Sequence, residues 1–350
     1  MKHNEIKIQG RLIGRGNPSF IIGEVAQAHD GSLGLAHSYI DAIADAGADA
    51  VKFQTHIADA ESSPDEPWRV QFSLQDKTRF DYWKRMEFSK DQWARIKNHA
   101  EQRDLIFISS PFSLEAADLL YSLDIAVWKI ASGELTNPVL LNKLAQTELP
   151  HIISTGMGSL EEIDRIVNDL NSKNIPFAVL QCTSCYPCPP EKIGLNMLSF
   201  FQNRYNCPVG LSDHSGTIFP SLAAVSLGAN IIEVHVTLNR HMVGPDVSSS
   251  VTFTELKMMV EGIRFIEKSL GNPIDKNKIF CELSPIREIF SKSIVLNKDL
   301  KKGSVLTKDD LTVKKPGTGI PAQEFERILG KKVKKELKTG VFLHLEDIED

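Results

Sequence analysis

A short apolar segment followed by an amphipathic helical segment recurs eight times along the first 270 residues. The apolar segments are 20–25, 50–54, 106–109, 127–130, 151–154, 177–181, 209–212 and 231–236. Each is almost continuously hydrophobic, as parallel strands are when helices cover both faces of their sheet. Eight strands in strict alternation with helices predict an α/β fold, a closed (β/α)8 TIM barrel, which needs about 250 residues.

A doubly wound open sheet has the same alternation and is the competing architecture. Such a sheet gathers its ligand-binding residues at one switch point in the strand order. Here polar residues follow nearly every strand, which favours the barrel. The opening segment 6–14 is typical of a small hairpin, in a position to plug the bottom of the barrel.

A long connection, residues 57–88, interrupts the alternation after the second strand and carries Trp68, Tyr82 and Trp83. Connections of this length are uncommon unless they act as lids or binding loops. A packed surface excursion is the alternative, and the sequence leaves both readings open.

The pattern changes after the helical segment 254–270, which ends at Gly271. Short strands punctuated by glycine and polar turns follow, and they indicate a second, β-rich domain. We therefore expect a barrel domain with its N-terminal hairpin over 1–284 and a small domain over 285–350, joined at Ser284-Pro285.

Charge and hydropathy argue against two classes of partner. The net charge of −5 is small and the basic residues are scattered, so no nucleic-acid binding is expected. The N-terminus has no apolar signal region, and no segment approaches the roughly 20 apolar residues of a membrane helix. We therefore expect a cytoplasmic protein with no membrane contact.

Three of the five cysteines, Cys182, Cys185 and Cys188, have the spacing C-x2-C-x2-C, which is also found in zinc and iron–sulfur sites. No fourth ligand stands at a standard spacing, because Cys207 lies far downstream. Ordinary reduced thiols are therefore favoured over a metal cluster.

Polar and charged side chains stand at the end of all eight predicted strands, which is where barrel enzymes hold their active sites. They are Glu24, Lys52, Gln54, Ser110, Lys129, Ser132, Glu134, Ser154, Thr183, Tyr186, Ser212, Asp213, His214, Glu233 and His235. Lysine and glutamate are almost never fully buried without a partner. Their convergence predicts that they pair with one another or with a charged ligand.

Two types of chemistry follow from these residues. Lys52 and Lys129, with the nearby hydroxyl groups, predict a site for a phosphate or carboxylate. A lysine of this kind could instead form a Schiff base with a carbonyl substrate, as in a barrel aldolase. His214 and His235 stand at the ends of adjacent strands and suit an open, exchangeable divalent metal site.

The motifs at these positions resemble those of the sialic acid synthase family. They are VKFQTH (51–56), SSPFS (109–113), KIASGE (129–134), ISTGM (153–157), LQCTSCYP (180–187), GLSDHSG (210–216) and GPD (244–246). The C-terminal part resembles the antifreeze-like SAF domain that ends synthases of this family. In that family the SAF domain caps the barrel of the partner subunit, so the resemblance implies a domain-swapped homodimer with Lys315 over the partner's sugar.

The resemblance also implies the reaction, in which phosphoenolpyruvate condenses with an N-acylated, mannosamine-like amino sugar. His214 and His235 would bind a divalent metal ion, Mn2+ or Mg2+. The candidate catalytic residues are Glu24, Glu134, Glu233 and Asp213. The candidate substrate-binding residues are Lys52, Gln54, Ser110, Lys129, Ser132, Ser154, Thr183, Tyr186, Ser212, Asp246 and Lys315.

Three departures from the family pattern fall where the sugar is expected. Lys315 replaces an arginine, which exchanges a planar bidentate donor for a point charge. Val234 replaces a basic residue, and the segment 239–250 differs around Asp246. The choice between N-acetylmannosamine and its bacterial diamino relatives therefore stays open. A Schiff-base aldolase or lyase and a non-catalytic carbohydrate-binding barrel are the alternative functions.

Overall fold

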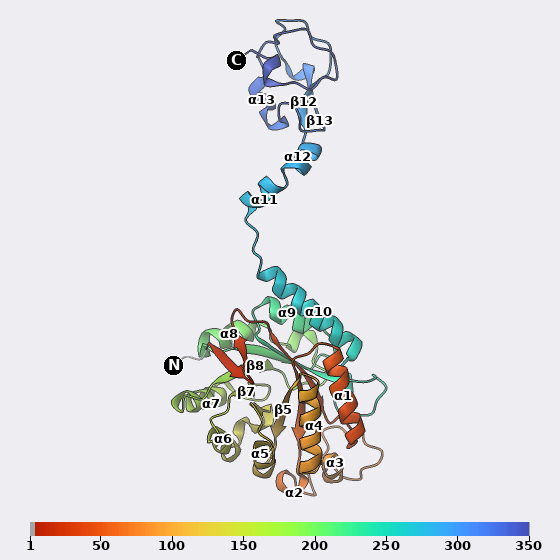
Figure 1. Cartoon of the computed structure of the whole chain (residues 1–350), viewed down its shortest axis with the longest axis vertical. Coiled ribbons are helices and arrows are strands. Elements are labelled where there is room, and N and C mark those ends of the chain that lie inside the picture. The colour runs from red at the N-terminus through yellow and green to blue at the C-terminus, as the bar shows by residue number, and fades with distance from the viewer. Residues whose placement is uncertain (1–3, 350) are drawn as a thin grey trace. The chain divides into compact units, whose positions relative to one another are not determined.

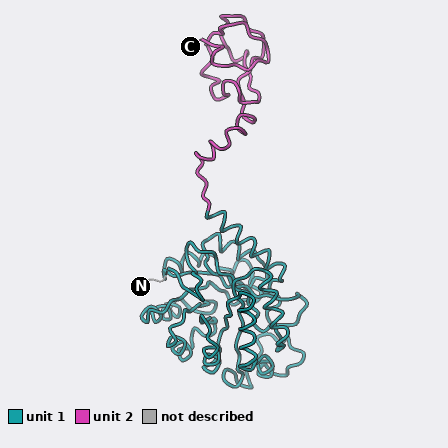
Figure 2. Tube along the Cα trace, viewed as in Figure 1, with its two compact units in different colours: residues 1–271 teal, residues 272–350 magenta. Residues whose placement is uncertain are grey.

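The structure is a computed structural model that describes residues 4–349. It divides into two compact units, Met1–Gly271 and Asn272–Asp350 (Figure 2). The division falls before the expected link at Ser284-Pro285, because the second unit includes helices α11 (Lys276–Glu282) and α12 (Ser284–Phe290). The carbonyl of Glu288 in α12 accepts a hydrogen bond of 2.6 Å from the Gly317 N–H, which joins this helix to the small domain.

The first unit is a near-closed parallel barrel, as the sequence predicts (Figure 1). The paired strands follow the order β5-β4-β3-β10-β9-β8-β7-β6, and β5 contacts β6, which brings the two ends of that order together. Their bounds are β3 (Phe20–Ala26), β4 (Ala50–Thr55), β5 (Ile106–Pro111), β6 (Trp128–Ile130), β7 (His151–Ser154), β8 (Phe177–Cys182), β9 (Val209–Asp213) and β10 (Ile231–Thr237). The doubly wound alternative is wrong, because its sheet would stay open.

The helices lie around the outside of the strands (Figure 1). They are α1 (Leu33–Asp45), α2 (Ala58–Glu61), α3 (Arg79–Met86), α4 (Lys90–Gln102), α5 (Leu114–Tyr121), α6 (Pro138–Ala145), α7 (Leu160–Ser172), α8 (Asn196–Tyr205), α9 (Phe219–Ser226) and α10 (Phe253–Leu270). Helix α7 begins at a capping box, in which the Ser159 and Glu162 side chains bond reciprocally to backbone N–H groups. The apolar face of this helix is buried from Ile163 onward, whereas Leu160 at the helix start is exposed.

The N-terminal hairpin closes the bottom of the barrel. Strands β1 (Glu5–Ile8) and β2 (Arg11–Gly14) pair antiparallel. Ile6, Ile8 and Ile13 are buried in one cluster with inward-facing strand residues such as Ile108 and Ile152. This apolar plug fills the end of the barrel opposite the polar strand ends.

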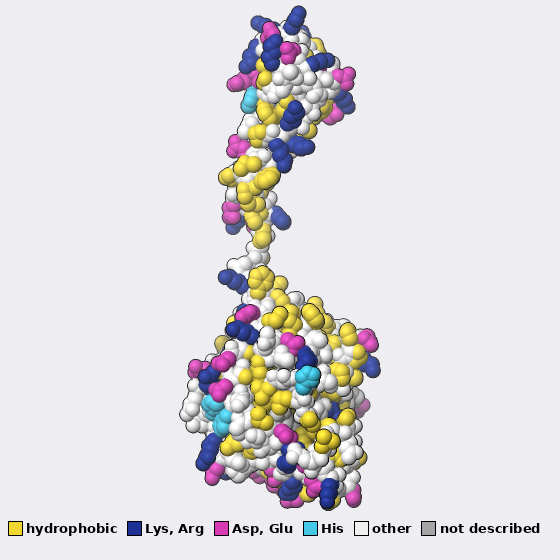
Figure 3. Space-filling model, turned by 90° about the vertical axis from the view of Figure 1, so that its right-hand side faces the viewer, with side chains coloured by type: hydrophobic (Ala, Val, Ile, Leu, Met, Phe, Trp, Pro, Cys, Tyr) yellow, Lys and Arg dark blue, Asp and Glu magenta, His cyan; other side chains and the backbone are white. Residues whose placement is uncertain are grey.

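The second unit has its own hydrophobic core. Strands β12 (Ser293–Leu296) and β13 (Leu311–Lys314) pair antiparallel, and helix α13 (Phe325–Ile328) contributes side chains to the same core. Helices α11 and α12 expose apolar side chains, and Figure 3 shows hydrophobic groups gathered along this segment. Within residues 4–349, no helix has both the length and the hydropathy needed to cross a membrane.

Candidate active site

A cavity of about 450 Å3 opens at the polar ends of the barrel strands. Most of the residues selected from the sequence line it: Glu24, Lys52, Gln54, Lys129, Ser132, Glu134, Ser154, Tyr186, Ser212, His214, Glu233, His235 and Asp246. Parallel pairing explains this convergence. Adjacent strands in register carry Glu24 beside Lys52 and His235 beside Glu24, so their side chains reach the same end of the barrel.

The part of the cavity formed by strand residues is a network of buried charges, which we call the basic floor: Lys52, Lys129, Ser154 and Ser212 with Glu24 and Glu233. The Lys52 ammonium lies 2.7 Å from Glu24 Oε2 and 3.9 Å from Glu233 Oε2. Lys129 Nζ lies 3.2 Å from Glu233 Oε1 and donates a hydrogen bond of 2.7 Å to Ser154 Oγ. The Ser212 hydroxyl donates to Glu233 Oε1 at 2.8 Å.

The two lysines of the basic floor differ in their electrostatics. Burial lowers the pKa of Lys129 below its usual value, and the attraction of Glu233 offsets only part of that effect. Burial acts in the same direction on Lys52, but Glu233 and Glu24 together outweigh it and leave the pKa of Lys52 raised. Burial opposes the ionisation of Glu233, yet Lys129 and Lys52 leave its pKa lowered. At neutral pH the floor therefore holds the Lys52 cation beside the Glu233 carboxylate.

Ser132 and Cys182 meet at one side of the floor. Ser132 begins a 3-10 turn after β6, and its Oγ accepts a hydrogen bond of 2.9 Å from the Gly156 N–H. A Cβ at Gly156 would stand 2.7 Å from Cys182 Sγ and 2.9 Å from Ser132 Oγ, so only glycine fits here. Burial raises the pKa of Cys182, which keeps it a neutral thiol.

His214 and His235 lie side by side in the cavity wall, with ring centroids 5.2 Å apart. His214 Nδ1 lies 3.1 Å from the Thr183 carbonyl, so this nitrogen is the N–H donor and Nε2 carries the lone pair. Burial and the neighbouring His235 lower the pKa of His214 to about 3. The neutral ring is the form that binds metal ions.

The rest of the cavity is formed by the segments that follow the strands, which include parts of α2 and α3, and we call this part the loop wall. It comprises Glu61, Glu66, Trp68, Arg69, Val70, Phe72, Arg79, Tyr82, Trp83, Phe112, Glu134, Met157, Tyr186 and Asp246. Ala58, Tyr82, Trp83 and Met86 are buried together, with Trp68, Phe72 and Phe80 packed against them. The connection 57–88 is thus a packed excursion that also forms part of the cavity wall.

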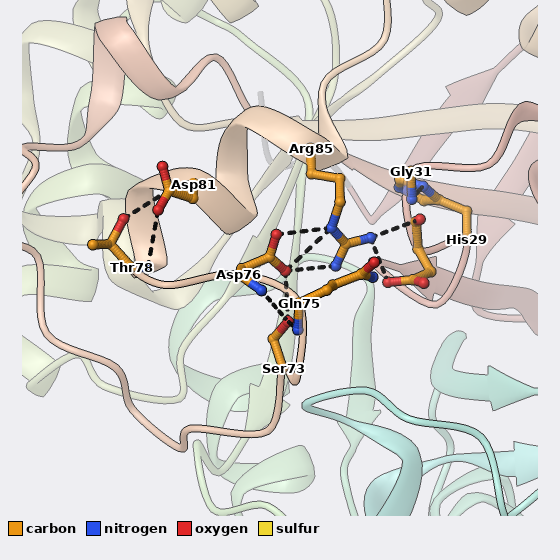
Figure 4. Close-up of polar contacts among 9 residues, drawn as sticks. His29, Gly31, Ser73, Gln75, Asp76, Thr78, Asp81 and Arg85 are labelled. Carbon is orange, nitrogen blue, oxygen red and sulfur yellow. Dashed lines mark hydrogen bonds and ion pairs between the residues drawn. The ribbon is translucent and has the colours of Figure 1, made fainter.

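Arg85 fastens this connection to the loop that follows β3 (Figure 4). Its guanidinium donates to both carboxylate oxygens of Asp76, with Nη2 to Oδ2 at 2.7 Å. It also donates to the carbonyl and the carboxylate of Asp30, at 2.9 and 2.7 Å. Ser73 donates to Asp76 at 2.6 Å, which ties the segment before α3 into the same set of contacts. Bidentate pairing of this kind fixes geometry as well as charge.

Four of the selected residues are not among the described residues that line the cavity. The Asp213 carboxylate accepts from the Ser215 N–H and hydroxyl and so shapes the loop after β9. The Thr183 hydroxyl donates to the Lys192 carbonyl. Ser110 is buried in β5. Lys315 belongs to the second unit, where its ammonium lies 4.8 Å from the centre of the Phe290 ring.

Residues 39–275 match the NeuB family, and residues 291–349 match the SAF domain. The chain belongs to the NeuB family. It is 37% identical over 326 residues to an N,N'-diacetyllegionaminic acid synthase of Campylobacter jejuni, covering 91% of this chain and 97% of the relative. It is 34% identical over 330 residues to the N-acetylneuraminate-9-phosphate synthase of Homo sapiens, covering 93% of this chain and 91% of the relative.

Solved structures agree with this assignment. The N-acetylneuraminic acid synthetase of Leptospira borgpetersenii is similar to this NeuB family member with a TM-score of 0.72 and 32% identity, covering 81% of this chain and 97% of that chain. The expected TIM barrel followed by a SAF domain, and the expected family, are confirmed. The relatives are synthases of sialic acid and of related acids.

The sequence reasoning missed several residues that line the cavity. Arg69 and Arg79 lie in the long connection, whose length and aromatic content indicated a binding loop without showing which side chains face inward. Glu61 lies in the same connection and was not selected. Cys182 was interpreted as an ordinary thiol, although its position directly after the predicted strand 177–181 was a signal that it reaches the site.

Proposed function

We propose that this protein is a sialic-acid-type (nonulosonate) synthase that condenses phosphoenolpyruvate with an N-acylated, mannosamine-like sugar and releases phosphate. The observation that carries the proposal is the convergence of two buried lysines and two histidines in one cavity. Buried ammonium groups require anionic partners, and neighbouring neutral imidazoles are typical metal ligands. The names of the relatives support the same class of enzyme.

Phosphoenolpyruvate binds at the basic floor. Lys52 and Lys129 neutralise its phosphate and carboxylate charges, and Ser132, Ser154 and Ser212 supply directed hydrogen bonds. The buried Ser110 hydroxyl has no hydrogen-bond partner among the described residues, so it remains a candidate for the same ligand. The sugar lies against Gln54, Glu134, Tyr186 and Asp246.

The donor set of His214 and His235 fits a divalent ion such as Mn2+ or Mg2+. The two imidazoles supply nitrogen ligands, and the described residues contain no group of three or more His, Cys, Asp or Glu side chains able to enclose a metal. The remaining ligands would thus come from water and substrate, which is typical of an open site. A bound divalent ion would act as a Lewis acid on the aldehyde oxygen of the sugar.

The residues of the chain then act on the reacting atoms. The methylene carbon of phosphoenolpyruvate attacks the aldehyde carbon, which forms the new carbon–carbon bond and leaves positive charge on the neighbouring carbon. The carboxylates of Glu24 and Glu233 stabilise that charge. Water adds to this carbon, and Glu24 takes one of its protons and passes it to the former aldehyde oxygen, which becomes a hydroxyl group. The carbon–oxygen bond to phosphate then breaks, the proton of the added hydroxyl leaves with the phosphate, and the keto group remains. Lys52 and Lys129 hold the departing phosphate.

A domain-swapped homodimer, in which Lys315 reaches the partner's sugar, is part of the proposal. It is supported by the apolar side chains that α11 and α12 expose. Lysine in place of arginine keeps the positive charge but loses the bidentate geometry. A cytoplasmic location remains a prediction.

The test measures phosphate release from phosphoenolpyruvate with a panel of N-acylated hexosamines, with and without EDTA. The proposal predicts release that depends on one of the sugars and stops on chelation. Phosphoenolpyruvate left unconsumed with every sugar, with manganese and magnesium present, would refute it.

A Schiff-base aldolase is the second candidate, because burial lowers the pKa of Lys129 and so favours the neutral amine that attacks a carbonyl. If the protein is such an aldolase, borohydride should trap a carbonyl substrate covalently on it, and its activity should persist in EDTA. The opposite pair of results favours the synthase.

A further inference from the structure

We propose that the loop wall selects a sugar without charge and rejects the same sugar carrying a phosphomonoester, and that Glu61, Glu66 and Glu134 set this selection. The inference rests on the proposed function, because it concerns the sugar that would meet phosphoenolpyruvate. The names of the relatives leave the question open: one is a synthase of a 9-phosphate, and others are named for acids without a phosphate.

Both arginines of the loop wall already have a carboxylate partner. Arg69 Nη2 lies 2.9 Å from Asp246 Oδ1, and the Arg69 guanidinium stacks 4.4 Å above the centre of the Tyr186 ring. Arg79 Nη1 lies 3.1 Å from Glu66 Oε1 and 3.0 Å from the Pro67 carbonyl. Their positive charge is therefore neutralised within the wall and is not available to an incoming phosphate.

Two further carboxylates of the wall have no lysine or arginine partner among the described ion pairs. Glu61 Oε1 lies 2.6 Å from His56 Nδ1. Glu134 accepts a hydrogen bond of 2.8 Å from Asn137. Burial raises the pKa of Glu134, and the charge of Glu61 adds to that shift, while Asn137 and His56 oppose it.

The charge balance of the wall is consequently negative. With all four of its carboxylates ionised, these and the two guanidinium groups sum to −2. A phosphomonoester brings about −1.5 to −2 more at neutral pH. Like charges placed together inside a cavity repel strongly, and such repulsion is a common device for rejecting a competing ligand.

The other side chains of the wall suit an acylated sugar. Trp68, Val70, Phe72 and Met157 present apolar surface, and the His56 ring stacks between Trp83 and Phe112 at 4.0 and 4.4 Å. Such surfaces pack against acyl methyl groups and the C–H faces of a sugar. The polar groups left between them can accept hydrogen bonds from hydroxyl and amide N–H groups.

The experiment compares N-acetylmannosamine with its 6-phosphate, alongside an N-acylated hexosamine panel, by following the consumption of phosphoenolpyruvate. Glu66→Gln removes one negative charge and frees Arg79, while the glutamine oxygen can still accept the 2.9 Å hydrogen bond from Trp83 Nε1. The matched control, Glu101→Gln, removes the same charge from the exposed surface of α4.

For the native protein we expect kcat/KM for the best uncharged sugar to exceed that for the phosphorylated sugar at least about tenfold, a factor kept modest by the partial exposure of the wall. Glu66→Gln should narrow this ratio several-fold and Glu101→Gln should leave it unchanged. Equal or better use of the phosphorylated sugar, or a ratio that both variants shift alike, overturns the inference while the proposed function stands. Phosphoenolpyruvate consumption with no sugar at all overturns both.

Discussion

Replacing Glu233 with glutamine tests whether the basic floor is a set of mutually dependent charges. The amide keeps the shape of the side chain and can still accept from Ser212, but it carries no charge. Lys52 retains Glu24 at 2.7 Å, whereas Lys129 loses the carboxylate 3.2 Å from its ammonium and keeps only Ser154. The variant therefore leaves one buried lysine without an ionic partner.

The loss of stability follows from the buried charge of Lys129, which has no ionic partner in the variant. Removing one partner of a buried ion pair costs about 3–5 kcal/mol. The loss has an upper bound, because Lys129 can give up its proton and fold as the neutral amine. Its ordinary pKa of 10.5 lies about 3.5 units above pH 7, and each unit is worth about 1.36 kcal/mol, so the bound at pH 7 is about 4.8 kcal/mol. The pKa of Lys129 is lowered on folding, so the unfolded state binds more protons and stability rises with pH. At pH 9 the bound falls to about 2 kcal/mol.

The assay is urea unfolding of native and variant protein at pH 7 and pH 9, followed by tryptophan fluorescence. All four tryptophans, Trp68, Trp83, Trp93 and Trp128, belong to the barrel unit, so the signal reports on that unit. The control is Glu101→Gln, which removes an exposed partner of Lys97 and should cost less than about 1 kcal/mol. The reasoning would be refuted if Glu233→Gln lowered the free energy of unfolding at pH 7 no more than the control does. It would also be refuted if the decrease were as large at pH 9 as at pH 7.

Three other perturbations have defined outcomes. His235→Ala should abolish turnover while phosphoenolpyruvate still binds in calorimetry; turnover with excess manganese would contradict the metal site. Arg85→Lys loses the bidentate contact with Asp76, so the KM for the sugar should rise about tenfold while that for phosphoenolpyruvate stays constant; equal rises in both would show a general structural loss. Burial lowers the pKa of His151 to about 4, so the unfolded state binds the extra proton and stability should fall by about 2 kcal/mol between pH 8 and pH 5 from this residue. In His151→Asn the urea midpoint should depend less on pH between pH 8 and pH 5. An unchanged pH dependence would show that His151 does not cause it.

The barrel could be predicted from the sequence because its signals are local and repeated. Each strand is an unbroken apolar run, and a parallel arrangement brings all eight strand ends to one mouth. Lys52, Lys129, His214 and His235 were therefore found by position alone. The family motifs contain three of them, Lys52, Lys129 and His214.

The loop wall could not be predicted, because side-chain direction in a long connection depends on contacts distant in sequence. Arg69 faces the cavity because it pairs with Asp246, which belongs to the loop after the last barrel strand. Arg79 does so because Glu66, within the same connection, lies in reach of it. Asp213 is the opposite case, since its place at a strand end indicates the site but its carboxylate accepts hydrogen bonds from Ser215.

The central claim is that the basic floor and the histidine pair join phosphoenolpyruvate to an aldehyde sugar. The most direct measurement is carbon NMR of a reaction that contains phosphoenolpyruvate labelled with 13C at its methylene carbon, an N-acylated hexosamine panel and manganese. The account predicts that the label appears in the CH2 group of a keto sugar acid, with one phosphate released for each molecule formed. Label that stays in phosphoenolpyruvate, or passes into free pyruvate, would contradict it.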